Sequence, residues 1–241
     1  MSFPDFSAND PQVQWQRFCE LLWFHDDLGM WLDISRMHVN LADLDTLKPR
    51  FQQAFTAMAD LEAGAIANAD EQRQVGHYWL RNPQLAPDAS VHAHVDAEVD
   101  AIEAFGHAVL KGEIKAPNGQ AFTDVLWIGI GGSGLGPLLM IRALQDAGTG
   151  LPFHFFDNVD PNGMSRVLAG LGDALPTTLV ITVSKSGGTP EPHLGMVQAK
   201  RRLEAAGGSW AGQAVAITMA DRKSTRLNSS HSSVSRMPSS A

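Results

Sequence analysis

The sequence is poor in features that would place it outside a reducing, aqueous compartment. Cys19 is its single cysteine, so no disulfide can form within the chain, which suits a reducing cytosol. No apolar run approaches the roughly 18 residues that span a bilayer. The first residues, 1–5, have neither the basic nor the apolar region of a signal peptide. We therefore expect a cytoplasmic protein that does not bind a membrane.

The sequence also lacks an excess of basic residues. Its 18 lysines and arginines stand against 26 acidic residues, which gives a net charge of −8. Proteins that bind nucleic acids generally carry a basic stripe, and the body of the chain has none. The apolar share of 44% is ordinary for a globular protein with a buried core. We expect no nucleic-acid partner.

Residues 1–110 are predicted to be helical. Asp10 and Pro11 have the residue types of an N-cap and a first helical position. Two apolar stripes with spacings of three and four follow, and each predicts one face of a helix that packs in the core. Their members are Leu41, Leu44, Leu47, Phe51, Phe55, Met58 and Leu61, and then Val91, Val95, Val99, Ile102 and Phe105.

Residues 111–220 are predicted to form an α/β domain. Four short apolar runs without polar alternation are typical of strands buried on both faces of a parallel sheet. These runs are residues 125–130, 153–156, 178–183 and 214–217. Helical segments at 136–147 and 189–206 lie between them. This alternation predicts a doubly wound parallel sheet, preceded by the helical region.

Residues 221–241 differ in composition from the rest of the chain. They hold eight serines and three arginines, with few large apolar residues. A natural disordered arm has this composition. The run from Lys223 to His231 also resembles translated sequencing-adapter read-through, and it begins where an α/β chain should continue. We favour the second interpretation and predict a disordered, non-native tail.

A glycine-rich segment, residues 129–137, follows the first predicted strand and precedes a helix. Glycines let the backbone approach a ligand closely, and a helix N-terminus favours an anion. The segment also fits the dinucleotide pattern G-x-G-x-x-G, with Asp157 as a possible ribose ligand. A tight turn without any ligand is a third possibility. This segment alone does not decide between them.

A second loop, residues 184–191, follows the third predicted strand and also precedes a helix. It holds three hydroxyls and an ammonium group, from Ser184, Lys185, Ser186 and Thr189. Such groups can donate to phosphate oxygens, and the lysine adds a charge-assisted contact. Thr189 could also cap the helix, with Pro190 at its first position, and both roles can hold together. A dinucleotide enzyme has no need of this second anion loop, whereas a phosphosugar site can use it.

Together the two loops resemble the sugar isomerase fold family, and within it the glucose-6-phosphate isomerases of bacterial and cyanobacterial type. The resemblance covers about residues 10–220. It includes residues 128–137, 184–191 and 157–161, and a helical motif E-x-R-x-x-x-H-x-x-L-R formed by Glu71, Arg73, His77, Leu80 and Arg81. For His77 and Arg81 we favour a buried polar network that supports the fold.

The resemblance implies a phosphosugar ligand. Ser184, Lys185, Ser186 and Thr189 would hold its phosphate, while Gly132 and Ser133 would line the sugar side of the pocket. It further implies an enzyme of glycolysis and gluconeogenesis that uses no metal or cofactor and is a homodimer at full length. An alternative is a regulatory domain of the same fold that binds a phosphosugar without converting it.

The resemblance also implies what this chain does not carry. The family's glutamate, histidine and lysine, which open the sugar ring and move a proton between C1 and C2, belong to its second half. An arginine thought to stabilise the enediolate also comes later. No such motifs occur in this sequence, which departs from the family pattern after about Thr218. We expect a truncated chain that has no catalytic residues of its own and is inactive.

Overall fold

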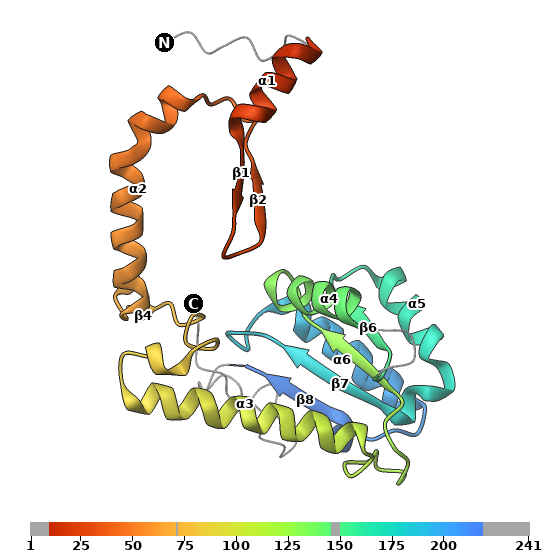
Figure 1. Cartoon of the computed structure of the whole chain (residues 1–241). Coiled ribbons are helices and arrows are strands. Elements are labelled where there is room, and N and C mark those ends of the chain that lie inside the picture. Colours follow the sequence, from red (N-terminus) through yellow and green to blue (C-terminus); the bar gives the residue numbers. More distant parts are fainter. Residues whose placement is uncertain (1–9, 71, 146–149, 219–241) are drawn as a thin grey trace. The chain divides into compact units, whose positions relative to one another are not determined.

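The computed structural model describes residues 10–70, 72–145 and 150–218. Contacts divide the chain into two compact units, Met1–Leu61 and Glu62–Ala241 (Figure 1). The tail predicted at residues 221–241 lies outside the described residues, so its nature stays a prediction. None of the helices in the described part is both long enough and apolar enough to cross a bilayer.

The described part of the first unit contains two helices and a hairpin. Its elements are α1 (Pro11–Leu21), β1 (Leu22–His25), β2 (Met30–Asp33) and α2 (Leu41–Glu62). The predicted cap of α1 is confirmed, since a carboxylate oxygen of Asp10 accepts a 2.8 Å hydrogen bond from the Gln12 amide. The antiparallel hairpin pairs Leu22 with Asp33 and His25 with Met30. This hairpin corrects the expectation that residues 1–110 are helical.

Helix α2 has the predicted span but not the predicted packing. None of its residues is buried in this structure. The expectation that its apolar stripe is part of a core is therefore wrong for this chain. The periodicity correctly indicates an amphipathic helix, but it says nothing of whether the surface that would cover the apolar side is present.

The second unit begins with short elements that lead into a long helix. These are β3 (Ile66–Asn68), β4 (Arg73–Gln74), the 3-10 turn η1 (Pro83–Leu85) and α3 (Ala89–Leu110). Asp88 caps α3 and accepts hydrogen bonds from the amides of Ser90 and Val91. The Ser90 side chain is the main cause that lowers the pKa of the Asp88 carboxyl, and the Val91 amide adds to it.

The rest of the second unit is a parallel sheet with its crossover helices. The strands are β5 (Asp124–Ile128), β6 (Phe153–Phe156), β7 (Thr178–Val183) and β8 (Ala214–Ile217). The helices are α4 (Gly132–Leu144), α5 (Pro161–Leu171), α6 (Pro190–Ala205) and α7 (Trp210–Gln213), with the 3-10 segment η2 (Gly172–Thr177). The strand order is β6-β5-β7-β8, and all neighbouring pairs are parallel.

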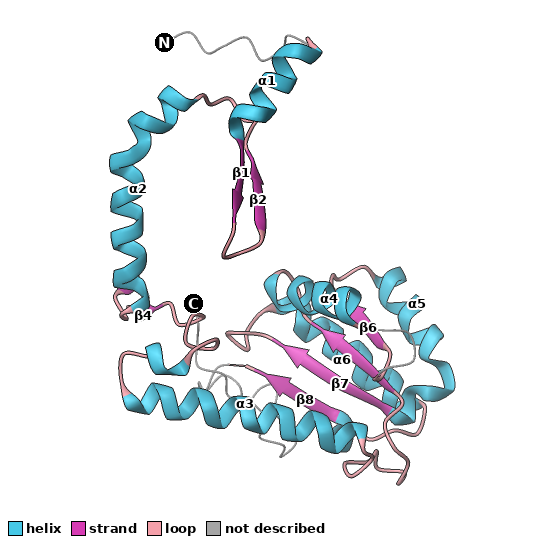
Figure 2. Ribbon diagram, in the orientation of Figure 1, coloured by secondary structure: helices cyan, strands magenta, loops and turns pink. Residues whose placement is uncertain are grey.

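Helices cover both faces of this sheet, which confirms the doubly wound α/β prediction (Figure 2). One face packs against α5, α6 and α7, and its core consists of Leu126, Ile128, Phe156, Met164, Leu168, Leu171, Leu175, Val180, Met196, Ala199, Leu203 and Trp210. The other face packs against α3 through Val109, Ala116, Phe122, Leu179 and Val215. Between α3 and α4 this second face retains an apolar cavity of about 570 Å³.

Candidate functional site

The two predicted anion loops lie at neighbouring strand ends. In the register of β5 and β7, Ile128 pairs with Thr182, so the segments that follow these two residues leave the sheet at the same edge. From β5 the chain crosses to β6 on one side, whereas from β7 it crosses to β8 on the other side. The site is therefore a topological switch point, where ligands of open α/β sheets generally bind.

Close backbone approach shapes the glycine loop. A Cβ atom on Gly134 would overlap the carbonyl oxygen of Gly129, and a Cβ on Gly129 would lie 2.6 Å from the Ser133 carbonyl oxygen. Gly131 adopts φ 55° and ψ −127°, a conformation that side chains disfavour. These positions let α4 begin directly at the end of β5. The loop backbone can then come close to a ligand.

Trp127 holds the glycine loop in place, a role that sequence reasoning missed. Its indole Nε1 donates a 2.8 Å hydrogen bond to the Ser133 carbonyl. The available signal was an indole N–H, which needs an acceptor, inside an otherwise aliphatic strand. Gly132 is exposed and Ser133 is partly exposed, so both predicted residues are accessible at the start of α4.

The hydroxyls of the second loop form a compact cluster. Ser184 is only 3% exposed, and its Oγ donates to Thr189 Oγ1 over 3.1 Å. The Ser186 hydroxyl lies 3.5 Å from the same Thr189 oxygen and accepts a 3.2 Å hydrogen bond from the Gly188 amide. The structure thus brings together three of the predicted side chains around one turn.

Thr189 occupies the N-cap position of α6, but its side chain does not cap the helix. Its hydroxyl oxygen accepts no hydrogen bond from an amide of the first turn. The hydroxyl faces Ser184 and Ser186 instead. Of the two roles considered for Thr189, side-chain capping is therefore wrong. The first turn of α6 keeps its partial positive charge beside a cluster of hydroxyls, an arrangement that favours an anion.

Lys185 is exposed at the tip of the same loop. Its carbonyl accepts a 3.5 Å hydrogen bond from the Thr218 hydroxyl, and the Ser184 amide donates to the Ile217 carbonyl over 3.0 Å. The loop is thus anchored to the end of β8 on one side and to α6 on the other. Chemically it offers hydroxyl and ammonium donors and no carboxylate from the predicted residues, which suits a phosphate.

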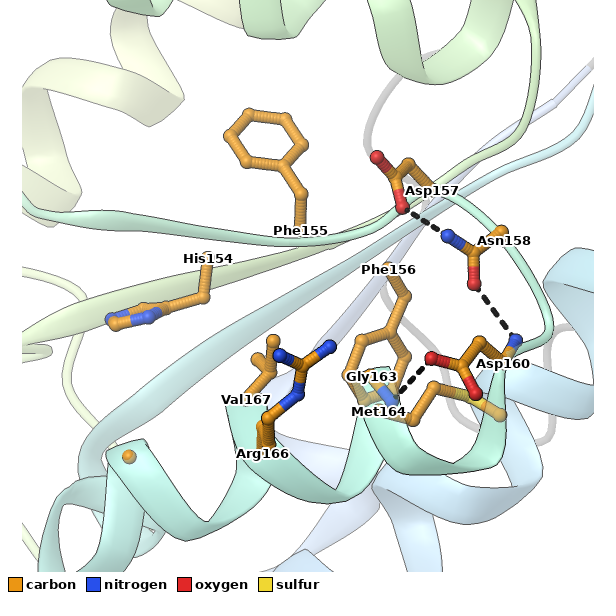
Figure 3. A pocket seen from close by; sticks show the side chains of 11 residues that line it. His154, Phe155, Phe156, Asp157, Asn158, Asp160, Gly163, Met164, Arg166 and Val167 are labelled. Carbon is orange, nitrogen blue, oxygen red and sulfur yellow. Dashed lines mark hydrogen bonds between the residues drawn. The ribbon is translucent and has the colours of Figure 1, made fainter.

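The third strand end nearby has its polar groups engaged in a turn (Figure 3). Asp157 accepts a 2.9 Å hydrogen bond from the Asn158 side chain, which in turn accepts from the Asp160 amide over 2.7 Å. Asp160 caps α5 by accepting from Gly163 over 2.8 Å. A groove of about 470 Å³ runs from this turn along β6, past Arg166. Asp157 and Asp160 thus both contribute hydrogen bonds to this turn, and the alternative of Asp157 as a ribose ligand stays a prediction.

Other polar residues from the sequence analysis lie on the surface. His77 and Arg81 are exposed, so the buried polar network expected for them is wrong in this chain. The first residue of their motif, Glu71, lies outside the described residues. Glu191 is in the first turn of α6 and His193 is exposed on that helix, as predicted. Within the described ranges, no three His, Cys, Asp or Glu side chains gather as metal ligands would.

Comparison with known proteins adds a family match. Residues 33–232 match the family model described as phosphoglucose isomerase. Over 223 residues, or 92% of the chain, the sequence is 74% identical to a glucose-6-phosphate isomerase of Synechococcus sp. (strain CC9605). It is 72% identical over 227 residues to that of Prochlorococcus marinus (strain MIT 9313).

A solved structure with a similar fold is the glucose-6-phosphate isomerase of Chlamydia trachomatis. It aligns with a TM-score of 0.67 and 26% sequence identity, over 86% of this chain and 40% of that one. The chain spans 42% and 41% of the lengths of the two curated relatives named above. The family match also extends past Thr218 into the segment predicted as a tail, whose boundary stays a prediction.

Proposed function

The chain belongs to the phosphoglucose isomerase family, and from this premise we propose that it is the phosphosugar-binding part of a glucose-6-phosphate isomerase. The main support for this proposal is the hydroxyl cluster of Ser184, Ser186 and Thr189, which lies beside the glycine loop at the switch point of the sheet. A sugar phosphate needs one site for its dianion and one for its hydroxyls. Two adjacent loops of this kind can supply both.

In this proposal the phosphate lies on the 184–189 loop. The hydroxyls that now bond one another would turn toward phosphate oxygens, while Lys185 would add a charge-assisted contact. Gly132 and Ser133 would line the sugar. They are accessible at the start of α4, and no side chain at Gly132 blocks the approach.

We further propose that this chain binds the sugar without isomerising it. The full reaction moves a proton between C1 and C2 and needs a base within hydrogen-bond reach of both carbons. None of the residues assigned to the pocket has a carboxylate. They are Gly132, Ser133, Ser184, Lys185, Ser186 and Thr189. Binding alone lowers no barrier, because catalysis requires interactions gained in the transition state.

Membership of this family also leads to expectations for the full-length protein. We expect the full-length protein to act in the cytoplasm, in glycolysis and gluconeogenesis, as a homodimer without metal or cofactor. Sedimentation of a full-length relative tests the dimer, and its activity after exhaustive chelation tests the metal.

Calorimetric titration with fructose 6-phosphate and with NAD tests the ligand assignment. We expect the 241-residue chain to bind the phosphosugar and not NAD, whereas binding of NAD alone would refute the proposal. A coupled assay that follows glucose 6-phosphate formation, on chain purified free of host isomerase, tests the second part. Turnover close to that of the full-length Synechococcus relative would show that this chain has catalytic residues we have not assigned.

A further inference from the structure

Strand β7 has two buried threonines on one face. Thr178 and Thr182 lie four residues apart, so their side chains project from the same side of the sheet. Thr178 is 0% exposed and Thr182 is 2% exposed. The two side chains therefore share their chemistry, their strand and nearly the same burial. They differ in their hydrogen bonds.

The hydroxyl of Thr178 is satisfied, whereas that of Thr182 is not. Thr178 Oγ1 donates a 2.8 Å hydrogen bond to the Ala174 carbonyl. Thr182 Oγ1 has no hydrogen-bond partner among the residues that the structure describes. The large majority of buried side-chain hydroxyls have a partner, because removing an unpaired polar group from water costs free energy. Valine would fill the same space without this cost, so packing alone does not explain a threonine at position 182.

The neighbours of Thr182 across the sheet are apolar. It pairs with Ile128 of β5 on one side and with Ala216 of β8 on the other. Helix α6 packs closely over this level of the sheet, since a Cβ atom on Gly195 would lie 2.9 Å from Ile128 Cγ2. The next residue of the chain on the same face is Ser184, whose hydroxyl belongs to the 184–189 loop.

Ser184 continues the strand beyond Thr182. Its amide donates to the Ile217 carbonyl over 3.0 Å, so the pairing of β7 with β8 extends to this residue. Residues two apart in a strand project from one face and are separated by about 6–7 Å. One water molecule can bridge two hydroxyls at such a spacing. The unpaired hydroxyl of Thr182 is thus next in line to a hydroxyl of the proposed phosphate site.

We propose, on the premise of the proposed function, that Thr182 is a positioning residue of the phosphosugar site and acts through Ser184. In the free chain the Ser184 hydroxyl donates to Thr189. In the bound state it turns to a phosphate oxygen, and the Thr182 hydroxyl donates to the Ser184 oxygen through one water molecule. A hydroxyl that accepts a hydrogen bond donates a stronger one. Thr182 therefore orients the Ser184 proton toward the phosphate and strengthens that contact.

The two threonines provide matched variants of the 241-residue chain. Thr182→Val should weaken fructose 6-phosphate binding by about 5-fold or more, while the urea midpoint stays the same or rises, because the hydroxyl has no partner in the free chain. Thr178→Val should do the reverse and lower the midpoint at unchanged affinity, because it loses the bond to Ala174. Thr182→Ser keeps the hydroxyl and should retain most of the parental affinity. Calorimetry and urea unfolding measure the two quantities.

A double-mutant cycle tests the route through Ser184. Ser184→Ala removes the hydroxyl that Thr182 orients, so in this background Thr182→Val should cause no further loss of affinity. A loss of equal size in both backgrounds would show that Thr182 does not act through Ser184, and it would overturn the proposal.

Other results refute the role of Thr182 in distinguishable ways. If the parent chain and Thr182→Val bind fructose 6-phosphate equally, this role is refuted while the proposed function stands. If the parent chain itself does not bind the phosphosugar, both are refuted. A Thr182→Val chain that does not fold, or whose urea midpoint falls as far as that of Thr178→Val, would show that the hydroxyl stabilises the free chain, which contradicts the proposal.

Discussion

The hydroxyl of Ser184 donates to the hydroxyl of Thr189 over 3.1 Å, across the turn between β7 and α6. This bond turns the threonine side chain away from the first amides of α6, although Thr189 holds the N-cap position. The helix gives up a side-chain cap as a result. Thr189 thus makes no capping bond and presents its hydroxyl to neighbouring hydroxyls instead. This arrangement is suited to binding a ligand, because buried polar groups normally need partners.

Thr189→Val tests the hydroxyl of Thr189. Valine keeps the β-branched shape and removes only the hydroxyl, which makes no capping bond but accepts the hydrogen bond of the buried Ser184 hydroxyl. Loss of this acceptor should lower the unfolding free energy by about 1–3 kcal/mol. Fructose 6-phosphate binding should weaken by about 10- to 150-fold, which corresponds to about 1.5–3 kcal/mol for a hydrogen bond to a charged group.

Asp160→Ala is the matched contrast at another N-cap. Asp160 does cap its helix, with bonds to the amides of Asn162 and Gly163. Its removal should cost about 1 kcal/mol of unfolding free energy. Its affinity for fructose 6-phosphate should stay unchanged. Denaturant unfolding and calorimetry of both variants test this contrast, and an Asp160→Ala protein that loses as much affinity as Thr189→Val would contradict the assignment of Thr189 to the phosphate site.

Lys185→Ala should weaken phosphosugar binding and preserve the fold. The side chain is exposed at the tip of the 184–189 loop, and the backbone carbonyl of this residue accepts the hydrogen bond from Thr218. Loss of a charge-assisted contact costs about 1.5–3 kcal/mol, so affinity should fall at least 10-fold. Lys200→Ala, which removes a surface lysine from α6, provides the control. Equal affinities in the two variants would exclude Lys185 from the phosphate site.

Gly134→Ala should destabilise the glycine loop. The added methyl would overlap the carbonyl of Gly129, and this backbone can yield only by moving α4 away from β5. Such overpacking typically costs about 1–3 kcal/mol. Gly136→Ala, two residues further on, meets no atom within 4 Å and should be neutral or stabilising by up to about 1 kcal/mol. The two melting temperatures should therefore move apart, and a common shift would argue against a tightly packed loop.

The sequence was most informative for the strands of the parallel sheet. The strands at 153–156, 178–183 and 214–217 agree with the structure at both ends, because continuous apolar runs bounded by turn residues leave little choice. The hairpin of β1 and β2 was missed, since its four-residue strands lie in a region dominated by helical patterns. Strands this short give a weak periodic signal.

The chemistry of the site was easier to predict than its geometry. Residue types alone identified the hydroxyls of the 184–189 loop, but not that Thr189 turns toward Ser184 and leaves α6 uncapped. The sequence also did not predict the extent of burial. The stripes of α2 and α3 look alike in sequence, but α3 has two buried residues and α2 has none.

Gln213 shows most clearly what residue type cannot reveal. It is 1% exposed, although glutamine is usually a surface residue. Its amide nitrogen donates to the carbonyls of Leu175 and Thr178 at 3.0 and 2.9 Å, and its oxygen accepts from the Ser209 amide at 2.9 Å. These bonds tie the end of η2 and the start of β7 to the segment before β8. One side chain therefore satisfies three backbone groups next to the core.

Gln213→Ala should accordingly be among the most destabilising single changes in the sheet domain. It leaves two carbonyls and one amide without their partner and opens a cavity, for a combined cost of about 2–5 kcal/mol. Gln213→Met nearly preserves the volume and removes only the polar contacts, so it isolates the hydrogen-bond contribution. Gln198→Ala, at an exposed position of α6, should change the unfolding free energy by less than about 0.5 kcal/mol. Urea unfolding ranks the three variants. If the Met variant were as stable as the parent chain, the bonds of Gln213 would contribute nothing net, and cavity formation alone would have to account for the loss in the Ala variant.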